Sequence, residues 1–245
     1  MSNYKIIVEY TGKNYSGWQI QAGKTTIEGE LVRAIVEISG EKVAVVGSGR
    51  TDAGVRACGQ VANFLLKKSF DPNKLVLALN AHLPNDISIK SAEIVADDFN
   101  ARFAAKRKTY EYYFYVAASR SSIYDEFALQ TKRADITKMQ QACKYLVGEH
   151  DFSSFVARNS GKTNFVRTIF DAKIEQVGDN LHKFIICGNG FLYNMVRIIM
   201  GTLIAVGEGK IAPEDVGKII DAKDRTKAGK TVSAVGLCLA SVEYD

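Results

Sequence analysis

The sequence predicts an α+β fold made of two ferredoxin-like α/β halves that form a mainly antiparallel sheet. Short strand-like segments alternate with helical ones in the order β-α-β-β-α-β over the N-terminal part of the chain. A second series of strands and helices follows without detectable sequence repetition. With three prolines and no low-complexity stretch, the chain leaves no room for a long linker, so we expect an N-terminal half at residues 1–104 and a C-terminal half at residues 105–245.

Two helices of the N-terminal half are predicted from residue types that commonly begin a helix. A helix is expected over residues 26–38, with Thr25 or Thr26 as the N-cap and Glu28 in its first turn. A second helix opens at Asp71 and Pro72, because proline suits the first helical turn. The hydrophobic pattern predicts strands at residues 4–10, 43–46, 60–66 and 87–94. This order is that of the ferredoxin-like unit, whose antiparallel sheet carries its helices on one face.

The C-terminal half is expected to repeat this architecture. The predicted strands cover residues 109–116, 166–176, 182–187 and 236–242, and the predicted helices cover 136–147, 191–206 and a short segment after Pro213. The residues VGDN at 177–180 indicate a hairpin turn. Alternation within the first of these strands places Tyr110, Tyr112 and Phe114 on one face, and most rings of this strand are expected to pack in the core.

Composition favours a polyanionic partner without identifying one. The net charge is +5 and the pI about 8.9, and two basic groups stand out, Arg102 to Lys108 and Lys223 to Lys230. Either group equally fits a solvated face. The longest apolar stretch, residues 191–207, contains Asn194 and Arg197, so we expect no membrane span, and the N-terminus lacks a signal peptide pattern. The four cysteines and three histidines are scattered, which predicts no zinc site, no disulfide framework and a cytoplasmic location.

The segment VVGSGRTDAGVRACGQVANF, residues 45–64, is the most informative in the chain. A strand runs into glycines, exposes Arg50 and Asp52, and returns to a second strand, so a cation and a carboxylate share one loop. A structural turn with a surface ion pair explains this pattern equally well. A dinucleotide fingerprint is excluded because Asp52 occupies the place of its last glycine and a strand follows. The Gly-Lys of a phosphate loop is also missing.

The whole segment resembles the GRTDAGV signature of tRNA pseudouridine synthases of the TruA family. The segments YTGKNYSGWQIQ, FNARFAAKRKTYEYYFY, GEHDFSSF, VRTI, FLYNMVRIIMG and GLCLASVEY are similar to further family motifs and occur in the same order. The resemblance therefore spans nearly the full chain. Two departures bear on substrate preference and loop geometry: Arg56 stands where members commonly have histidine, and Ser233 to Val235 lacks the usual proline.

The resemblance implies an enzyme that isomerises uridine to pseudouridine in a tRNA anticodon stem-loop, at positions 38–40, without a cofactor. It implies a central active-site cleft, to which the N-terminal half contributes the catalytic loop and the C-terminal half the remainder, and a homodimer. Asp52 is then the essential carboxylate, acting either as a nucleophile at C1′ of the ribose or as a base at C2′. The sequence leaves both routes open.

The other site residues follow from the same resemblance. Tyr110 matches a tyrosine that stacks on the target base, and Leu237 would press on the uracil from another side. Arg50 is suited to entering the space that a flipped base vacates. Arg197 lies in an apolar helix, where a buried arginine needs a partner, and the family places its match beside the catalytic aspartate. Without the resemblance, a snorkelling Arg197 stays an alternative.

Two readings from other classes remain as alternatives. Ferredoxin-like sheets often present aromatic residues to single-stranded RNA, so the chain fits an RNA-binding module without catalysis. However, KTYEYYFY lacks the glycine-containing consensus of the RNA-recognition motif. A nucleotide-dependent enzyme on an α/β scaffold is disfavoured by the missing glycine patterns.

Overall fold

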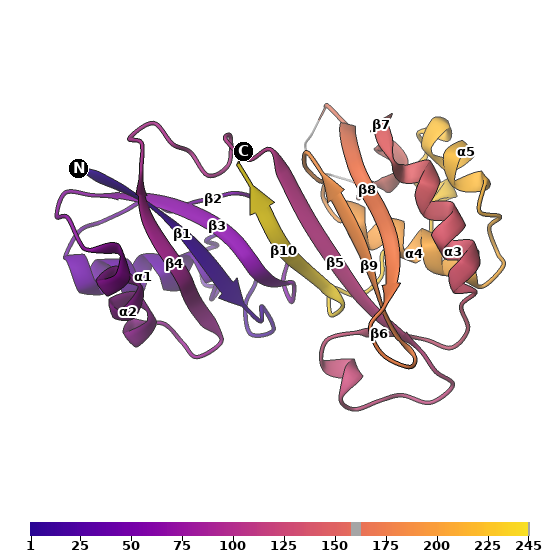
Figure 1. Cartoon of the computed structure of the whole chain (residues 1–245), viewed down its shortest axis with the longest axis horizontal. Coiled ribbons are helices and arrows are strands. Elements are labelled where there is room, and N and C mark those ends of the chain that lie inside the picture. The colour runs from indigo at the N-terminus through magenta and orange to yellow at the C-terminus, as the bar shows by residue number, and fades with distance from the viewer. Residues whose placement is uncertain (158–162, 245) are drawn as a thin grey trace. The chain divides into compact units, whose positions relative to one another are not determined.

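The computed structural model describes residues 1–157 and 163–244. It contains two compact units, each of mixed α/β structure (Figure 1). The first unit comprises Met1–Lys106 together with the chain from Cys238 onward, and the second comprises Arg107–Leu237. The predicted α+β class with mainly antiparallel strands is confirmed. The domain boundary predicted after residue 104 stays a prediction.

The first unit has the predicted order β-α-β-β-α-β. Its elements are β1 (Ser2–Tyr10), α1 (Ile27–Ser39), β2 (Val46–Gly47), β3 (Arg56–Leu66), α2 (Pro72–His82) and β4 (Ile87–Val95). The strand order is β4-β1-β3 with β2 on the other side of β3, and these pairs are antiparallel. The late strand β10 (Leu237–Glu243) pairs parallel with the start of β3. Alternate side chains of β1, including Tyr4, Ile6 and Val8, are fully buried, as a strand with one core face requires.

Both helices of this unit begin where the sequence predicts. Thr26 caps α1 by accepting a hydrogen bond from Gly29 N at 3.2 Å, and Asp71 caps α2 by accepting one from Lys74 N at 3.0 Å. Pro72 occupies the first turn of α2, where its missing N–H has no helical partner to lose.

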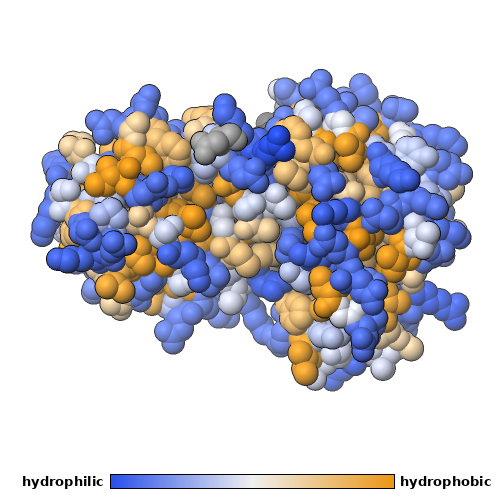
Figure 2. All heavy atoms as spheres, in the orientation of Figure 1, coloured by the Kyte–Doolittle hydropathy of each residue, from blue (hydrophilic) through white to orange (hydrophobic). Residues whose placement is uncertain are grey.

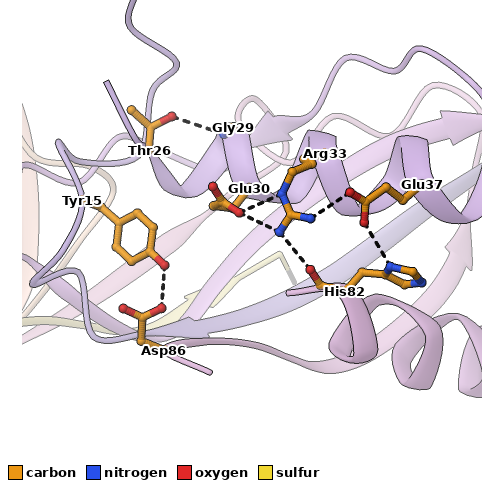
Figure 3. A network of polar contacts seen from close by, with 8 residues as sticks. All are labelled: Tyr15, Thr26, Gly29, Glu30, Arg33, Glu37, His82 and Asp86. Carbon is orange, nitrogen blue, oxygen red and sulfur yellow. Dashed lines mark hydrogen bonds and ion pairs between the residues drawn. The ribbon is translucent and has the colours of Figure 1, made fainter. Parts of the chain in front are cut away.

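A polar network ties the two helices together at the surface (Figure 3). Arg33 on α1 donates to Glu30 and Glu37 and reaches the backbone oxygen of His82 at the end of α2. The His82 ring contacts Glu37 in turn, at 3.0 Å. The Arg33 guanidinium lowers the pKa of the Glu37 carboxyl. The network is exposed, so its contribution to stability is small, although it links α1 to the end of α2.

The second unit contains the remaining strands and the more apolar helices. Its elements are β5 (Arg107–Val116), β6 (Leu129–Thr131), α3 (Ile136–Cys143), β7 (Gly148–Asp151), β8 (Val166–Gln176), β9 (Leu181–Gly188), α4 (Met195–Gly207) and α5 (Asp215–Ala222). The run β5-β9-β8-β7 is antiparallel throughout, and β6 joins β5 in parallel. The order β5-β9-β8 is that of the first, third and second strands of a ferredoxin-like unit.

Several element bounds differ from the sequence prediction for local reasons. The strand expected at residues 43–46 is reduced to Val46–Gly47, because only these two residues pair with β3. The helix expected at 136–147 ends at Cys143 and continues as a 3-10 turn, Lys144–Leu146. The helix expected from residue 191 begins at Met195, because Asn194 has a left-handed backbone with φ 59°.

The α4 helix is the most buried helix of the second unit. Nearly all of its residues are buried, including the polar Thr202. Among the described residues, no helix is both long enough and apolar enough to span a membrane. In Figure 2, hydrophilic side chains are spread over the visible face, with apolar ones scattered between them.

Candidate functional site

The loop between β2 and β3, residues 48–55, carries the predicted carboxylate. Asp52 lies at its turn and is half-buried. The backbone oxygen of Asp52 accepts a hydrogen bond from Val55 N at 3.2 Å, and Gly54 has φ 78°, a conformation that glycine adopts without strain. The turn therefore has a defined backbone, which sets where the carboxylate projects.

Buried polar side chains hold this loop from the core side. Ser48 donates to Gln60 Oε1 at 2.7 Å, and Gln60 donates to the backbone oxygen of Gly49 at 3.0 Å. The hydroxyls of Tyr10 and Thr51 share a hydrogen bond of 2.8 Å. Burial raises the pKa of Tyr10, so its hydroxyl stays neutral. A satisfied buried network of this kind makes the loop rigid.

The segment before α1 packs onto the same loop. Trp18 N donates to Thr51 O at 3.0 Å, and the Trp18 ring lies so close to Gly47 that a Cβ there would be 2.6 Å from the ring. Gly17 has φ 90°, and a Cβ at this position would be 2.7 Å from Thr51 O. Any side chain at either glycine would push the segment away from the loop. The two motifs noted in the sequence thus form one packed structure.

Arg50 is held by a chain of hydrogen bonds that leads back to α1. Its Nε donates to Gln19 Oε1 at 2.9 Å, and Gln19 Nε2 donates to Glu28 Oε2 at 2.7 Å. The same Glu28 oxygen accepts from Ile20 N at 2.8 Å, and Glu28 is buried in the first turn of α1. Gln19 and Glu28 were not predicted as site residues. Gln19 could have been identified from the sequence, because it lies in YTGKNYSGWQIQ, the N-terminal segment that resembles a family motif.

Tyr110 lies on β5 and is half-buried. Its ring meets Phe191 edge-on, with 5.1 Å between centroids and an interplanar angle of 83°. The neighbouring rings of Tyr112, Phe114 and Tyr115 are fully buried. The expectation that most rings of this strand are core residues is therefore confirmed, and Tyr110 and Tyr113 are the two more accessible rings.

Arg197 stands in the first turn of α4, half-buried, with its guanidinium fixed by neighbours. Its Nε donates to Val232 O at 2.8 Å and its Nη1 to Asn194 Oδ1 at 2.7 Å. Asn194 is the residue with the left-handed backbone, so the break before α4 also aims an amide oxygen at the arginine. The Tyr112 hydroxyl donates to Ser233 O at 2.6 Å and so stabilises the loop that contains Val232.

Leu237 begins β10 and is buried, with 6% of its surface exposed. Leu237 N donates to Ala234 O at 2.9 Å, and Tyr113 N donates to Gly236 O at 2.8 Å. A Cβ at Gly236 would lie 2.4 Å from Tyr113 O, so glycine is required before the leucine. This close approach explains why a glycine precedes Leu237.

The predicted site residues fall into two sets. Arg50 and Asp52 share the loop of the first unit, and Tyr110, Arg197 and Leu237 belong to the second. Their convergence in one cleft, and the pairing of Asp52 with Arg197, stay predictions.

The predicted basic groups are partly engaged within the protein. Arg225 donates to Ala228 O and Gly229 O, so it stabilises its own loop. Lys223 forms an ion pair with Asp151, with 3.2 Å between Nζ and Oδ2. Arg107 stacks over Phe170, 4.5 Å from the ring centroid. Among residues 1–157 and 163–244, no three His, Cys, Asp or Glu side chains gather as a metal site would require.

Comparisons with known proteins agree on one family. A family model described as tRNA pseudouridine synthase matches residues 6–104 and 142–245. A protein named tRNA pseudouridine synthase A from Caldicellulosiruptor saccharolyticus is 47% identical over 245 residues, covering 100% of both chains. Proteins of the same name from Acetivibrio thermocellus and Clostridium acetobutylicum are each 44% identical over 245 residues, again covering 100% of both chains.

Proposed function

Because this chain belongs to the tRNA pseudouridine synthase family, we propose that it isomerises uridine to pseudouridine in tRNA, in the anticodon stem-loop at positions 38–40. The observation that carries the proposal is the full-length similarity to proteins named tRNA pseudouridine synthase A. The reaction breaks the bond between ribose C1′ and uracil N1, turns the base, and joins C5 to C1′. Uridine and pseudouridine are isomers, and the proton lost from C5 is balanced by one gained at N1, so no group or electron has to be supplied and no cofactor is proposed.

Asp52 is the proposed catalytic residue. Its carboxylate either attacks C1′, so that the base leaves and returns by displacing the aspartate, or removes a proton from C2′ as the base leaves, which gives a glycal; C5 of the base then adds to C1′ while the proton returns to C2′. In both routes the C5 proton is lost at the end. The rigid, hydrogen-bonded loop supports this assignment, because a preorganised carboxylate avoids the cost of ordering it during the reaction.

The second unit would supply the groups that surround the base. Tyr110 would stack on uracil, with its ring orientation supported by Phe191, and Leu237 would confine the detached base. Arg197 would pair with Asp52 and favour its ionised form. Two hydrogen bonds, to Val232 O and Asn194 Oδ1, support this role because they fix the guanidinium before substrate arrives.

Arg50 would act on the RNA rather than on the reacting bonds. A uridine stacked in a stem has to leave the helix, at a cost of a few kcal/mol, before C1′ can be reached. A planar guanidinium can stack in the vacated space and hold a phosphate or a base edge. The link from Arg50 to Gln19 supports the proposal, since it presents the cation in a defined direction.

The partner proposed for this chain is tRNA, and the acting form a homodimer in the cytoplasm. The net charge of +5 is consistent with a polyanionic substrate. Basic residues near Arg102 to Lys108 and Lys223 to Lys230 would contact the phosphate backbone.

Tritium release from tRNA tests the proposed function directly, because isomerisation removes the hydrogen on C5. A tRNA transcript made with 5-tritiated uridine is folded and incubated with the purified protein alone, without nucleotide. We expect tritium release and carbodiimide-reactive pseudouridine at positions 38–40. Binding without release would instead identify an RNA-binding module. Release that depends on added nucleotide would identify a nucleotide-dependent enzyme.

A further inference from the structure

Two cysteines that are 180 residues apart in the chain meet on paired strands of the first unit. Cys58 lies on β3 and Cys238 on β10, and the parallel register aligns Cys238 with Arg56 and Leu239 with Ala57. Residues two apart on a strand project from the same face. Cys58, two residues after Arg56, therefore projects from the same face as Cys238.

The two thiols are close enough to share a hydrogen bond. Their Sγ atoms are 3.5 Å apart, and neither cysteine is in a disulfide. A disulfide has about 2.0 Å between its sulfurs, so bond formation requires an approach of about 1.5 Å. A displacement of this size is on the scale of a side-chain rotation.

The pair is asymmetric in accessibility. Cys58 is exposed, whereas Cys238 has 3% of its surface exposed. The hydrogen bond with Cys58, together with burial, raises the pKa of Cys238 well above that of an ordinary thiol. An oxidant from solution therefore reacts with Cys58 first, because Cys238 is buried and its thiol stays protonated. Redox-sensitive cysteines commonly have this arrangement of an accessible thiol beside a resolving one.

We propose that Cys58 and Cys238 form a reversible thiol–disulfide site that hydroperoxides oxidise. The Cys58 thiolate attacks one peroxide oxygen, the O–O bond breaks, and Cys58 becomes a sulfenic acid while water leaves. The sulfur of Cys238 then loses its proton and attacks the Cys58 sulfur, the S–O bond breaks, and a second water leaves. Two thiols and one hydrogen peroxide thus give one disulfide and two waters. The proposal is independent of the proposed function.

The cross-link would lie beside the candidate site. Cys58 follows the Asp52 loop on β3, and Cys238 directly follows Leu237. The disulfide would link β3, which follows the Asp52 loop, to β10, which begins with Leu237, the residue proposed to contact the base. The scattered cysteines argue against a structural disulfide framework, and a reversible pair is consistent with that argument.

Peptide mapping after oxidation tests the site. The full chain is reduced, treated with stoichiometric hydrogen peroxide, digested without reductant and analysed by mass spectrometry. We expect one linked pair of peptides, containing Cys58 and Cys238 and lacking two hydrogen atoms, that separates on treatment with dithiothreitol. Cys58→Ser should abolish the link. Cys187→Ser, which removes a partly exposed cysteine from β9, should leave it intact.

The buried partner needs a second readout, because Cys238→Ser can disturb packing. In this variant a folded protein should accumulate sulfenic acid at Cys58, trapped by dimedone, where the wild type gives the disulfide. The proposal is overturned if the wild type converts Cys58 to sulfinic acid or to an intermolecular disulfide without linking Cys238. It is also overturned if both thiols survive peroxide while the accessible Cys187 reacts.

Discussion

Arg50 donates a hydrogen bond from its Nε to Gln19 Oε1 at 2.9 Å, so a cation on the candidate catalytic loop is held by a residue outside that loop. Gln19 is held in turn by Glu28 in the first turn of α1. The direction in which Arg50 points thus depends on the packing of a helix N-terminus. This relationship makes Gln19 a positioning residue for the proposed base-flipping step.

Replacing Gln19 tests that role. Gln19→Leu should lower kcat/KM for tritium release about tenfold, the size expected for losing one hydrogen bond to a charged group. Gln19→Glu combined with Glu28→Gln keeps an acceptor for Arg50 and a donor between positions 19 and 28, so this double variant should recover most of the activity. Gln21→Leu is a matched control, because Gln21 donates to Ser16 O instead. Equal losses in Gln19→Leu and in the double variant would show that Gln19 does not act through Arg50.

Asp52→Asn should abolish isomerisation while tRNA affinity stays within about tenfold of wild type, because phosphate contacts rather than one carboxylate dominate binding. Tritium release and filter binding measure the two properties separately. Asp98→Asn, at an exposed carboxylate elsewhere in the first unit, should leave both unchanged. Turnover by Asp52→Asn close to that of wild type would remove Asp52 from the mechanism.

Arg197→Met tests the proposed pair with Asp52. Loss of the cation should cripple turnover and move the acidic limb of the pH–rate profile to higher pH, because an unpaired carboxylate protonates more readily. The free energy of unfolding should also fall, but by less than the about 3 to 5 kcal/mol of a fully buried pair, because both side chains are half-buried. The double variant Asp52→Asn, Arg197→Met should regain stability but stay inactive. Additive stability effects would show that the two side chains do not interact.

Asn194 combines a backbone role with a side-chain role, and two substitutions separate them. Asn194→Gly keeps the left-handed conformation and removes the hydrogen bond to Arg197. Asn194→Ala removes the bond and also strains the backbone, so its free energy of unfolding should be lower by about 1 kcal/mol than that of the glycine variant. Both variants should lose activity similarly. Equal stabilities in urea unfolding would contradict the predicted strain.

His182 should make stability depend on pH on the acid side of neutrality. Its ring is buried, stacks on Phe114 at 5.4 Å, and has an Nδ1 that finds no partner among the described residues. Burial lowers the pKa of His182 below its ordinary value of 6.5. The unfolded chain therefore binds more protons, and the free energy of unfolding should fall as the pH drops below about 6.5. His182→Phe should flatten this dependence between pH 5 and 7.5. An unchanged slope would refute the assignment.

Periodicity and start signals predicted the main elements of both units. Thr26 and Asp71 are the helix caps that the residues indicated, and β8 has the predicted bounds. The strands β6 and β7 escaped prediction because three and four residues are too short to show a period. The start of α4 was misplaced because an asparagine, rather than a glycine, takes the left-handed conformation there.

Long-range contacts explain what the sequence could not reveal about the site. The roles of Gln19 and Glu28 depend on how the segment before α1 folds over the catalytic loop, and no local pattern encodes that. The meeting of Cys58 with Cys238 depends on the parallel pairing of β3 with β10. Spacing in the sequence does not reveal which cysteines meet through contacts between distant strands.

The pairing of β10 with β3 also has a consequence for how the protein is made. Because the first unit includes the chain from Cys238 onward, a ribosome has to synthesise the entire second unit before the first can be finished. During that interval the start of β3 lacks its parallel neighbour and presents an open edge, which other nascent chains can pair with. Termination between Lys227 and Cys238 would leave that edge permanently unpaired, although all the helices would have been translated.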